Sequence, residues 1–303
     1  MKKVLLTGAT GFIGRHCIEP LSSRGYEVHA VSSRDARDNS ADAFWHRADL
    51  MDSERVSSLM GEVRPTHLLH FAWFVEPGKY LTSLENFYWA RASMDLLQAF
   101  AQHGGERVVM AGSCIEYDWN YGYCSEWLTP LSLSTPYASC KQSLHVMLDS
   151  FAGQTDLSAA WGRVFFLYGP HEHPARLVSS VVRAVLRGEV APCSHGEQVR
   201  DFLHVRDVAD AFAALLDSDV SGAVNIASGR PVAIKDIVHE IGEKVGGRDL
   251  IRLGTLPDSE SEPPLLVADI GRLRDEVGWT PEYDLDRGLE QTVNWWKARK
   301  DYG

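Results

Sequence analysis

A tyrosine and a lysine, Tyr137 and Lys141, lie four residues apart and carry side chains suited to proton transfer. Four residues make about one helical turn, so the phenol and the ammonium lie on one face of a helix. A helix start is predicted just before them, because Ser134 or Thr135 can cap it and Pro136 suits its first position. A free phenol has a pKa of about 10, and a neighbouring cation favours the phenolate. The spacing therefore predicts a proton donor tuned toward neutral pH.

Ser113, upstream of this pair, adds a hydroxyl that can hold a substrate oxygen against Tyr137. With Tyr137 as proton donor, Lys141 as cation and Ser113 as orienting group, the three residues are predicted to support hydride transfer to or from a carbonyl. The alternative is a helix face that packs its side-chain stems on the core and continues through Leu144 and Leu148. The glycine-rich turn at the N-terminus favours the chemical role.

Three glycines recur at three-residue spacing between a short apolar strand and a helical pattern. Glycine lets the backbone approach a pyrophosphate closely, and a helix N-terminus offers unpaired N–H groups and a positive dipole end. The turn therefore predicts a dinucleotide cofactor, with a ligand-free strand–helix turn as the alternative. The predicted contacts are Gly8, Thr10, Gly11, Phe12, Ile13 and Gly14.

The end of the second predicted strand favours NADP(H) over NAD. NAD-binding proteins usually place an acid there to hold the ribose hydroxyls. Ser32, Ser33 and Arg34 stand at that place, and two hydroxyls with a guanidinium suit a 2′-phosphate better. Arg15 can add a second positive charge, whereas Asp35 weakens the preference. The alternative for Arg34 is a solvated loop residue.

Short apolar strands alternate with helical patterns over the first half of the chain. This alternation predicts an α/β fold with a Rossmann-type, doubly wound parallel sheet. Asp49 follows the expected third strand and can accept a hydrogen bond from adenine, with a surface helix cap as the alternative. Strands are predicted at Lys3–Thr7, Glu27–Ser32, His67–Ala72, Arg107–Ala111 and Ser158–Phe165, and helices at Ile13–Arg24, Asp52–Gly61, Leu84–His103 and Tyr137–Gly153.

The second half of the chain predicts a smaller C-terminal α/β substrate lobe. A stretch rich in Gly, His and Pro at 168–174 indicates the crossing into this lobe, and Asp207 is predicted to cap a helix over 207–216. The predicted division is a Rossmann domain of residues 1–168, with 200–230 returning to it, and a substrate lobe of residues 169–199 and 231–303.

Composition narrows the partners. The 303-residue chain carries a net charge of −11, so no nucleic-acid partner is expected. No apolar run is long enough for a membrane span, and Met1 leads directly toward the first strand rather than into a secretory signal, so a cytoplasmic protein is expected. The five cysteines are odd in number and lack metal-type pairing, so we expect reduced thiols and no metal site.

The chain resembles, almost end to end, the extended short-chain dehydrogenases/reductases of the nucleotide-sugar branch. The glycine turn and the pair of Tyr137 and Lys141 are marks of the superfamily. The other marks, of which the later ones are telling for the branch, are Asp49-Leu50, His70-Phe71-Ala72, Ser113 four residues before Tyr117, Arg163, Tyr168-Gly169-Pro170, Arg200 to Val205, Asn225 to Gly229 and Gly278-Trp279-Thr280-Pro281.

This resemblance implies a nucleotide-diphosphate sugar as substrate and a homodimer joined through the helices at 84–103 and 137–153. It assigns Arg200 to the substrate diphosphate, a role that suits a planar guanidinium. Leu177 matches a position that lines the nucleotide pocket, and Arg176 lies nearby. The alternatives are an ion pair between Arg200 and Asp201, and a core position for Leu177. The further cofactor contacts that it implies are Leu50, Phe71, Ala72 and Lys141.

Departures from the family narrow the reaction. In its sugar 4,6-dehydratases an acid pair follows the Ser/Thr and performs elimination, whereas Cys114 and Ile115 follow Ser113. Glu116 comes one place later and is expected to face away, and Phe166 replaces an asparagine that contacts the substrate. One group of aromatic residues can line a deoxysugar pocket, stack on a base or pack at the dimer helix. Its members are Trp73, Phe74, Tyr80, Phe87, Tyr88 and Trp89.

These features favour NADPH-dependent reduction of a nucleotide-linked 4-keto-6-deoxy sugar, with Tyr137 as proton donor. An NAD-dependent nucleotide-sugar 4-epimerase uses the same residues and is the main alternative. Two further alternatives are a non-catalytic dinucleotide-binding sensor and a reductase of a non-nucleotide carbonyl. The presence of both Tyr137 and Lys141 argues against the sensor, and Arg200 argues against the non-nucleotide substrate.

Overall fold

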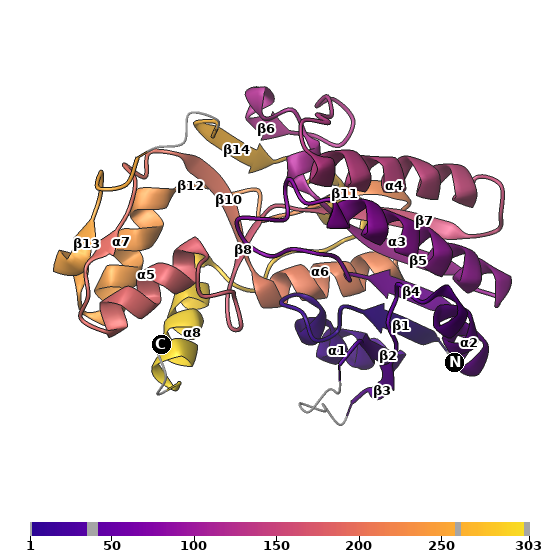
Figure 1. Cartoon of the computed structure of the whole chain (residues 1–303). Helices are drawn as coiled ribbons and strands as arrows, with labels where there is room; N and C mark the ends of the chain where they lie inside the picture. The colour runs from indigo at the N-terminus through magenta and orange to yellow at the C-terminus, as the bar shows by residue number, and fades with distance from the viewer. Residues whose placement is uncertain (1, 35–41, 258–261, 300–303) are drawn as a thin grey trace.

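A parallel β-sheet forms the centre of the larger part of the protein (Figure 1). The computed structural model describes residues 2–34, 42–257 and 262–299. Neighbouring strands of the sheet run parallel throughout, which confirms the predicted Rossmann-type α/β fold. In spatial order, the seven strands that the described residues form are β11 (Gly222–Ile226), β7 (Ser158–Val164), β5 (Arg107–Ser113), β4 (His67–His70), β1 (Lys3–Thr7), β2 (Glu27–Ser32) and β3 (Phe44–Arg47).

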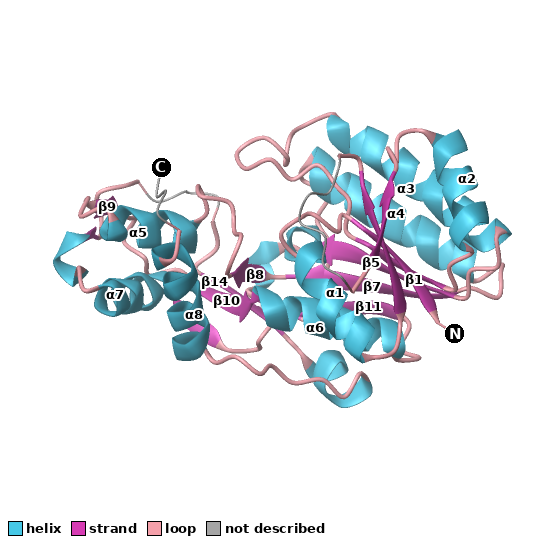
Figure 2. Ribbon diagram, turned by 90° about the horizontal axis from the view of Figure 1, so that it is seen from below, coloured by secondary structure: helices cyan, strands magenta, loops and turns pink. Residues whose placement is uncertain are grey.

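Helices cover both faces of this sheet, as Figure 2 shows. Successive side chains of a strand point to opposite faces, so each strand feeds two cores. Leu5 joins the core beneath one layer of helices, whereas Val4 and Leu6 join the core beneath the other. The first layer comprises α2 (Ser53–Val63), α3 (Glu85–Gln102) and α4 (Pro136–Ala152), and the second comprises α1 (Gly14–Ser23) and α6 (Val205–Asp217).

A second, smaller group of elements has its own core. Its helices α5 (Leu177–Leu186), α7 (Ile234–Val245) and α8 (Leu285–Lys297) pack on one another and bury a third cluster of apolar side chains. The strands outside the large sheet are β6 (Tyr123–Cys124), β8 (Phe166–Tyr168), β9 (Ala191–Pro192), β10 (Val199–His204), β12 (Pro231–Ala233), β13 (Ile251–Arg252) and β14 (Leu265–Ala268). The short helical turns are η1 (Cys114–Glu116), η2 (Trp119–Tyr121), η3 (Arg248–Leu250) and η4 (Arg272–Glu276).

The chain passes between the two groups more than once. β8 pairs with β10, and β10 continues to β14 and β12 in the smaller sheet. The next elements, α6 and β11, belong to the large sheet, because α6 packs on α1 and β11 pairs with β7. As a result, segments that lie far apart in the sequence meet at the edge of the large sheet where β5 and β7 end.

One predicted helix start is wrong. The sequence predicted that Asp207 caps a helix, whereas α6 begins at Val205 after His204. Asp207 is buried, and its carboxylate accepts hydrogen bonds from the backbone N–H groups of Glu282 (3.1 Å) and Tyr283 (2.9 Å). Burial raises the pKa of this carboxyl to about 6. The side chain therefore ties α6 to the segment that leads into α8 instead of capping its own helix.

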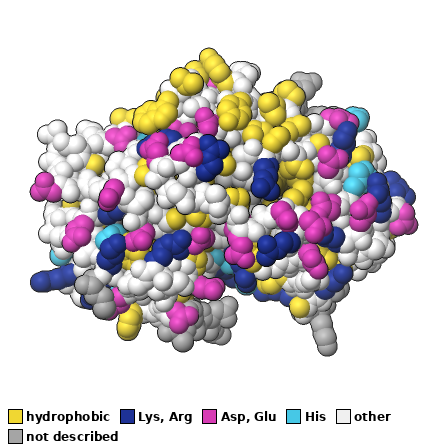
Figure 3. All heavy atoms as spheres, turned by 180° about the vertical axis from the view of Figure 1, so that it is seen from behind, with side chains coloured by type: hydrophobic (Ala, Val, Ile, Leu, Met, Phe, Trp, Pro, Cys, Tyr) yellow, Lys and Arg dark blue, Asp and Glu magenta, His cyan; other side chains and the backbone are white. Residues whose placement is uncertain are grey.

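Hydrophobic side chains gather along the top of the molecule in Figure 3, at the level where Figure 1 shows β6 and β14. Among the exposed apolar side chains, Tyr123 lies on β6 and Leu265 on β14, and Tyr121, Trp127 and Leu128 are close to β6 in the sequence. No helix within the described residues is both long and apolar enough to cross a membrane.

Candidate active site

The turn between β1 and α1 has a shape that requires glycine. Gly8 has φ +67°, and a Cβ on it would lie 2.9 Å from the backbone nitrogen of Ala72. A Cβ on Gly14 would lie 2.3 Å from the carbonyl oxygen of Gly8. Ile13, just before α1, has no side chain that could cap the helix, which suits an anion at this N-terminus. The residues fit a bound pyrophosphate. The remaining predicted contacts of this turn are Thr10, Gly11 and Phe12.

Phe71 and Ala72, which follow β4, border the turn on its other side. The backbone N–H groups of Phe71 and Ala72 donate to the carbonyl oxygen and the hydroxyl of Thr7, each at 3.3 Å. His70 bridges the hydroxyls of Thr7 (2.7 Å) and Ser93 (2.8 Å). Burial and the nearby ammonium of α4 lower the pKa of His70 to about 3, so this ring is neutral at physiological pH. The structure thus brings the predicted contacts after β4 against the glycine turn.

The end of β2 carries the predicted 2′-phosphate contacts. The Ser32 hydroxyl accepts a hydrogen bond from the backbone N–H of Arg34 (3.1 Å), while the side chains of Ser33 and Arg34 are exposed. The exposed Asp49 accepts a hydrogen bond from the backbone N–H of Met51 (3.0 Å), whereas the cap of α2 is Asp52. Leu50 is buried in the core. Asp35 lies outside the described residues.

Arg15 turns back over the glycine turn. Its guanidinium donates to the carbonyl oxygens of Thr10 (2.7 Å) and Gly11 (3.2 Å) and contacts the ring of His171 from the loop after β8. The charge that was predicted to face the 2′-phosphate is therefore shared with the turn itself. A cavity of about 460 Å³ opens at this place. Its lining residues are Phe12, Arg15, His171, Glu172, His173, Pro174, Trp295, Trp296 and Arg299.

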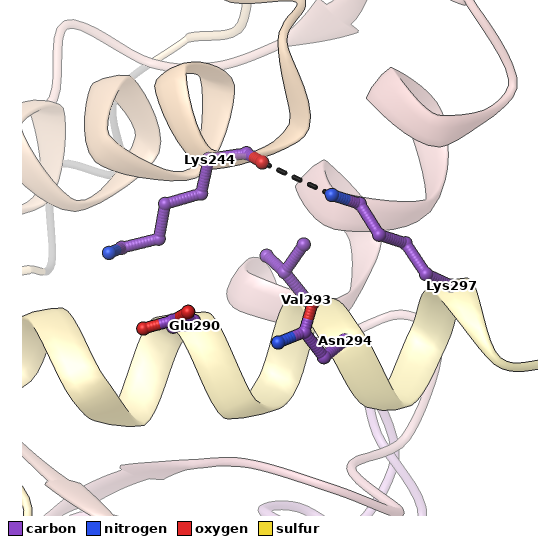
Figure 4. Close-up of a pocket in the computed structure, with 5 residues that line it drawn as sticks. All are labelled: Lys244, Glu290, Val293, Asn294 and Lys297. Carbon is purple, nitrogen blue, oxygen red and sulfur yellow. Dashed lines mark hydrogen bonds between the residues drawn. The ribbon is translucent and has the colours of Figure 1, made fainter.

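A second cavity, of about 330 Å³, lies between α7 and α8 (Figure 4). The Lys297 ammonium donates to the carbonyl oxygen of Lys244 (3.2 Å) across it. None of the predicted site residues lines this cavity, so it is separate from the candidate active site. Its lining residues are Lys244, Glu290, Val293, Asn294 and Lys297.

The three predicted catalytic residues lie together at the end of β5 and the start of α4. The Thr135 hydroxyl, one of the two caps predicted from the sequence, caps α4 by accepting from the N–H of Ala138 (3.1 Å). Tyr137 and Lys141 are 6% and 5% exposed, so both side chains point into the protein. The Lys141 ammonium lies 5.9 Å from the centre of the Tyr137 ring. The Ser113 hydroxyl acts on the Tyr137 phenol in the direction of a lower pKa.

Burial, rather than the neighbouring cation, dominates the protonation of this pair. The pKa of Tyr137 is raised above its ordinary value, first by burial and then by the charges of Tyr80 and Glu116, while the Ser113 hydrogen bond opposes the rise. Burial lowers the pKa of Lys141 to about 7. The sequence predicted a pKa shift of the phenol toward neutrality, and the shift is in the opposite direction because both groups lie away from solvent. Tyr137 therefore holds its proton, as a proton donor must.

Aromatic rings surround Tyr137 and Lys141. The Lys141 ammonium lies 3.7 Å from the centre of the Trp73 ring and donates to the carbonyl oxygen of Ala111 (2.8 Å). Trp73 is anchored by its hydrogen bond to Asn86 (2.8 Å). Tyr80 meets the Tyr137 ring edge to face at 5.0 Å.

The aromatic group identified in the sequence thus divides between two places. Trp73 and Tyr80 border the candidate site, whereas Phe87 and Tyr88 are 55% and 57% exposed on the outer face of α3. Phe74 and Trp89 are half-buried. The sequence carried no signal of this division, because Trp73 and Tyr80 belong to the segment between β4 and α3, whereas Phe87 and Tyr88 belong to α3 itself.

The predicted substrate residues lie where the second half of the chain returns. Arg200 is 2% exposed; its guanidinium pairs with Glu262 (3.2 Å) and lies 5.6 Å from the Phe166 ring. Asp201 instead accepts from the backbone and hydroxyl of Ser228 (2.8 and 2.6 Å), so the alternative ion pair between Arg200 and Asp201 does not form. Burial lowers the pKa of Arg200.

Arg176 and Leu177 stand at the start of α5. The Arg176 guanidinium lies 5.6 Å from the centre of the Tyr80 ring, and Tyr80 contacts Tyr137. Leu177 is half-buried and packs against the third core, which is close to the core position given above as the alternative to a pocket role. The structure therefore connects Arg176 to the catalytic pair through a single aromatic ring.

Glu116 is the residue that sequence reasoning undervalued. It was expected to face away from the site, and its carboxylate indeed points into the core, but it is fully buried directly below Ser113. It accepts hydrogen bonds from the backbone N–H of Ser113 (2.7 Å), the indole of Trp161 (3.1 and 3.0 Å) and the guanidinium of Arg163 (2.9 Å). The available signal was a buried arginine on the next strand, which requires an acid nearby.

The residues that the structure describes contain no group of three or more His, Cys, Asp or Glu side chains that could hold a metal ion. All five cysteines are free and buried in the structure.

Comparison with known proteins gives the family. Residues 4–227 match the NAD dependent epimerase/dehydratase family. The UDP-glucose 4-epimerase of Rhizobium meliloti is 26% identical over 99% of this chain and 98% of that protein. The CDP-abequose synthase of Salmonella typhimurium is 25% identical over 96% of this chain and 97% of that protein. The structure of MoeE5 in complex with UDP-glucose and NAD has a TM-score of 0.83 at 30% identity, covering 98% of this chain and 99% of that one.

A doubly wound sheet with a glycine turn and a tyrosine–lysine pair at its edge is the framework of the short-chain dehydrogenases/reductases, and the relatives narrow the class to nucleotide-sugar enzymes. The chain belongs to the NAD dependent epimerase/dehydratase family. This confirms the resemblance seen in the sequence.

The buried ammonium makes Lys141 costly for stability. Its pKa in the folded protein, about 7, is below the value of about 10.5 expected in the unfolded chain. The unfolded state binds more protons than the folded state between about pH 7 and pH 10.5, so stability rises with pH over this range. The destabilisation by Lys141 is therefore full below about pH 7 and disappears above about pH 10.5. Lys141→Met is expected to raise the free energy of unfolding at pH 7 by about 1–2 kcal/mol and to abolish turnover.

Thermal melts at pH 7 and pH 10.5 measure this effect. The gain from Lys141→Met should shrink as the pH rises through the unfolded-state pKa, whereas Lys79→Met, at an exposed ion pair with Glu76, should change the melting temperature little at either pH. A Lys141→Met protein that is less stable than the wild type at pH 7 would contradict the argument.

Proposed function

We propose that the protein is an NADPH-dependent reductase of a nucleotide-linked 4-keto-6-deoxy sugar. The glycine turn and the end of β2 would hold the dinucleotide, which supplies hydride to the ketone carbon. Tyr137 would give its phenolic proton to the ketone oxygen, and Ser113 would hold that oxygen in place. Lys141 would hold the cofactor ribose and favour the phenolate that forms when the proton has left.

The observation that carries this proposal is the cluster of Ser113, Tyr137 and Lys141 without a carboxylate in position for elimination. The residues after Ser113 are Cys114, a buried thiol whose pKa burial raises, and Ile115. The carboxylate of the next acid, Glu116, already accepts hydrogen bonds from three donors. Hydride transfer coupled to proton transfer is therefore the chemistry that these side chains support best.

The surroundings of Tyr137 suit a deoxygenated sugar carried by a nucleotide. Trp73 and Tyr80 present apolar ring surfaces beside the phenol, which favours a methyl group over a hydroxymethyl group. The guanidinium of Arg200 would bind the diphosphate after its ion pair with Glu262 has opened. Relatives named for UDP-glucose and CDP-abequose chemistry support a nucleotide-sugar substrate.

The choice of NADP(H) rests on the end of β2. Ser32, Ser33 and Arg34 place hydroxyls and a guanidinium there, without a carboxylate among the described residues of that segment. MoeE5 holds NAD in its structure, which supports the alternative cofactor. A reductase exchanges its cofactor at each turnover, so an open and exposed contact such as Arg34 agrees with a dissociable cofactor.

The second candidate is an NAD-dependent nucleotide-sugar 4-epimerase. It would use Ser113, Tyr137 and Lys141 in the same roles and return the hydride to the other face of the sugar. The observation that favours it is the name of a relative that spans nearly the whole chain, the UDP-glucose 4-epimerase of Rhizobium meliloti. Because the catalytic groups are common to both reactions, the fate of the cofactor decides between them.

A homodimer through α3 and α4 would cover the apolar side chains that these two helices expose. The two helices pack side by side on one face of the sheet. Leu84, Phe87 and Tyr88 are exposed at the start of α3, and Val146 and Met147 are exposed on α4. Their burial against a second copy would remove them from water.

A cofactor and turnover assay tests the proposed function. The purified protein is denatured to identify any bound dinucleotide, and fresh protein is mixed with NADPH or NADH and a panel of nucleotide-linked 4-keto-6-deoxy sugars. Stoichiometric oxidation of NADPH by one sugar is the expected result. Retained NAD with interconversion of two sugar nucleotides, and no net oxidation, would overturn the reductase in favour of the epimerase.

Tyr137→Phe removes the proposed proton donor and leaves the ring contacts with Tyr80 and Trp73. Turnover is expected to fall about 100- to 10,000-fold, because general acid catalysis contributes rates of that order. The dissociation constant of the dinucleotide should stay within about twofold of the wild type. Tyr123→Phe, at an exposed position on β6, is the matched control and should keep full activity. Unchanged turnover in Tyr137→Phe would refute the assignment.

Arg34→Ala tests the cofactor preference. Loss of a charge-assisted contact with the 2′-phosphate is expected to raise the dissociation constant of NADPH about 10- to 100-fold, while that of NADH stays unchanged. Fluorescence titration with each dinucleotide measures both constants. Equal, small effects on the two dinucleotides would show that Arg34 is a solvated loop residue and that NADP(H) is not selected there.

A further inference from the structure

We propose that Glu116 is a positioning residue of the candidate active site: its buried carboxylate fixes Ser113 from below and places a negative charge beneath Tyr137 and Lys141. This inference rests on the proposed roles of these three residues. It assigns to Glu116 a role that differs from elimination chemistry, because its carboxylate would act through Ser113 and Lys141 and would not touch the substrate.

Two hydrogen bonds join Ser113 to the residues of η1 that follow it. The Ser113 hydroxyl accepts from the backbone N–H of Ile115 (3.3 Å), and the Glu116 carboxylate accepts from the backbone N–H of Ser113 (2.7 Å). This reciprocal capping box ends β5 at a fixed place. Because the carboxylate holds the backbone of Ser113, it sets the position from which the hydroxyl reaches Tyr137.

The two oxygens of Glu116 face different partners. Oε1 accepts from Ser113, whereas Oε2 accepts from the guanidinium of Arg163 on β7 (2.9 Å), and the indole of Trp161 donates between them. Glu116 is fully buried and Arg163 is 2% exposed. The carboxylate is thus a bridge between the core of the sheet and the backbone of a catalytic residue.

Gly112 makes room for this bridge. A Cβ at that position would lie 2.6 Å from Oε1 of Glu116 and 2.1 Å from the indole nitrogen of Trp161. The backbone at the end of β5 therefore approaches Glu116 more closely than any residue with a side chain would allow. The strand, the acid and the indole form one fixed unit directly before Ser113.

The charge of Glu116 acts on the catalytic pair. It opposes the effect of burial on Lys141 and so raises the pKa of the ammonium, and it adds to the raised pKa of Tyr137. In both cases a buried negative charge favours the protonated form, which is the form that a proton donor and a cation require.

The other groups that face Glu116 do not supply this charge. Cys114 and Tyr117 hold their protons because burial raises the pKa of each, and burial lowers the pKa of His145 to about 3. Arg163 also donates from one nitrogen to the Tyr117 hydroxyl (3.1 Å). Glu116 is therefore the acid that faces the catalytic pair among the described residues packed around its carboxylate. Those residues are Arg163 and Trp161 of β7, Cys114 and Tyr117 beside η1, and Tyr137, Lys141 and His145 of α4.

Glu116→Gln and Glu116→Asp test the proposal. Glu116→Gln removes the charge but keeps a hydrogen-bonding side chain of the same size. In the pH profile of kcat/KM for ketone reduction, the decline at high pH is the basic limb. In Glu116→Gln this limb is expected to move about one pH unit lower, because Tyr137 and Lys141 lose their protons more readily. The kcat of this variant is expected to fall about 10- to 100-fold. Glu116→Asp keeps the charge and should restore the position of the limb, although not the full kcat.

Two controls keep a folding defect apart from the proposed effect. Glu116→Gln leaves the Arg163 charge buried without its acid, so the double variant Glu116→Gln/Arg163→Gln, which is neutral, serves if the single variant does not fold. It should show the same shift of the basic limb. Glu126→Gln changes a different carboxylate, which is partly buried and accepts from the backbone N–H of Asn225 (2.8 Å), and should leave the limb in place.

An activity-independent measurement separates this inference from the proposed function. In protein labelled at the lysine side chains, the NMR signal that disappears in Lys141→Met is followed against pH. The Lys141 pKa is expected to be lower in Glu116→Gln than in the wild type, whether or not a substrate has been found. An unchanged Lys141 pKa and an unmoved basic limb would overturn the role of Glu116, and neither result depends on which sugar the enzyme reduces.

Discussion

The fully buried ion pair between Glu116 and Arg163 is the interaction on which the candidate active site depends. It joins the end of β5 to β7 where the large sheet meets the smaller group of elements. Burying two charges is expensive unless each is paired and further hydrogen-bonded, and here an indole and a backbone N–H complete the carboxylate. The pair therefore holds the backbone in a single arrangement under Ser113, because any displacement would leave a charge uncompensated.

Burial accounts both for the protonation of the cluster of Tyr137 and Lys141 and for its cost in stability. Tyr137 and Lys141 lie out of solvent, against aromatic rings that exclude water. Exclusion of water disfavours the phenolate and the ammonium alike, so the phenol keeps its proton and the ammonium loses its proton more easily. Such burial costs stability, and the nearby charge of Glu116 partly restores the protonated form of Lys141.

The distinction between a reductase and an epimerase does not lie in the catalytic residues. Both reactions need a proton donor, a cation and an orienting hydroxyl at the edge of the sheet. They differ in whether the dinucleotide leaves after the hydride has been transferred, which depends on the contacts at the end of β2 and over the glycine turn. Arg15 binds the carbonyls of that turn and contacts His171 in the loop after β8, so it links the glycine turn to the segment that leads into α5.

The sequence by itself determined the fold class, because alternating apolar strands and amphipathic helices leave few ways to bury both faces of a parallel sheet. It also determined the start of α4, since the cap and the proline before Tyr137 act locally. It did not determine what depends on contacts between distant segments. The direction of the Tyr137 pKa shift follows from how deeply α4 is buried, and the place of Asp207 follows from a backbone segment about 75 residues further along the chain. Only the tertiary structure brought Glu116 and Arg163 together beneath Ser113, because periodicity and spacing carry no information on which strands become neighbours.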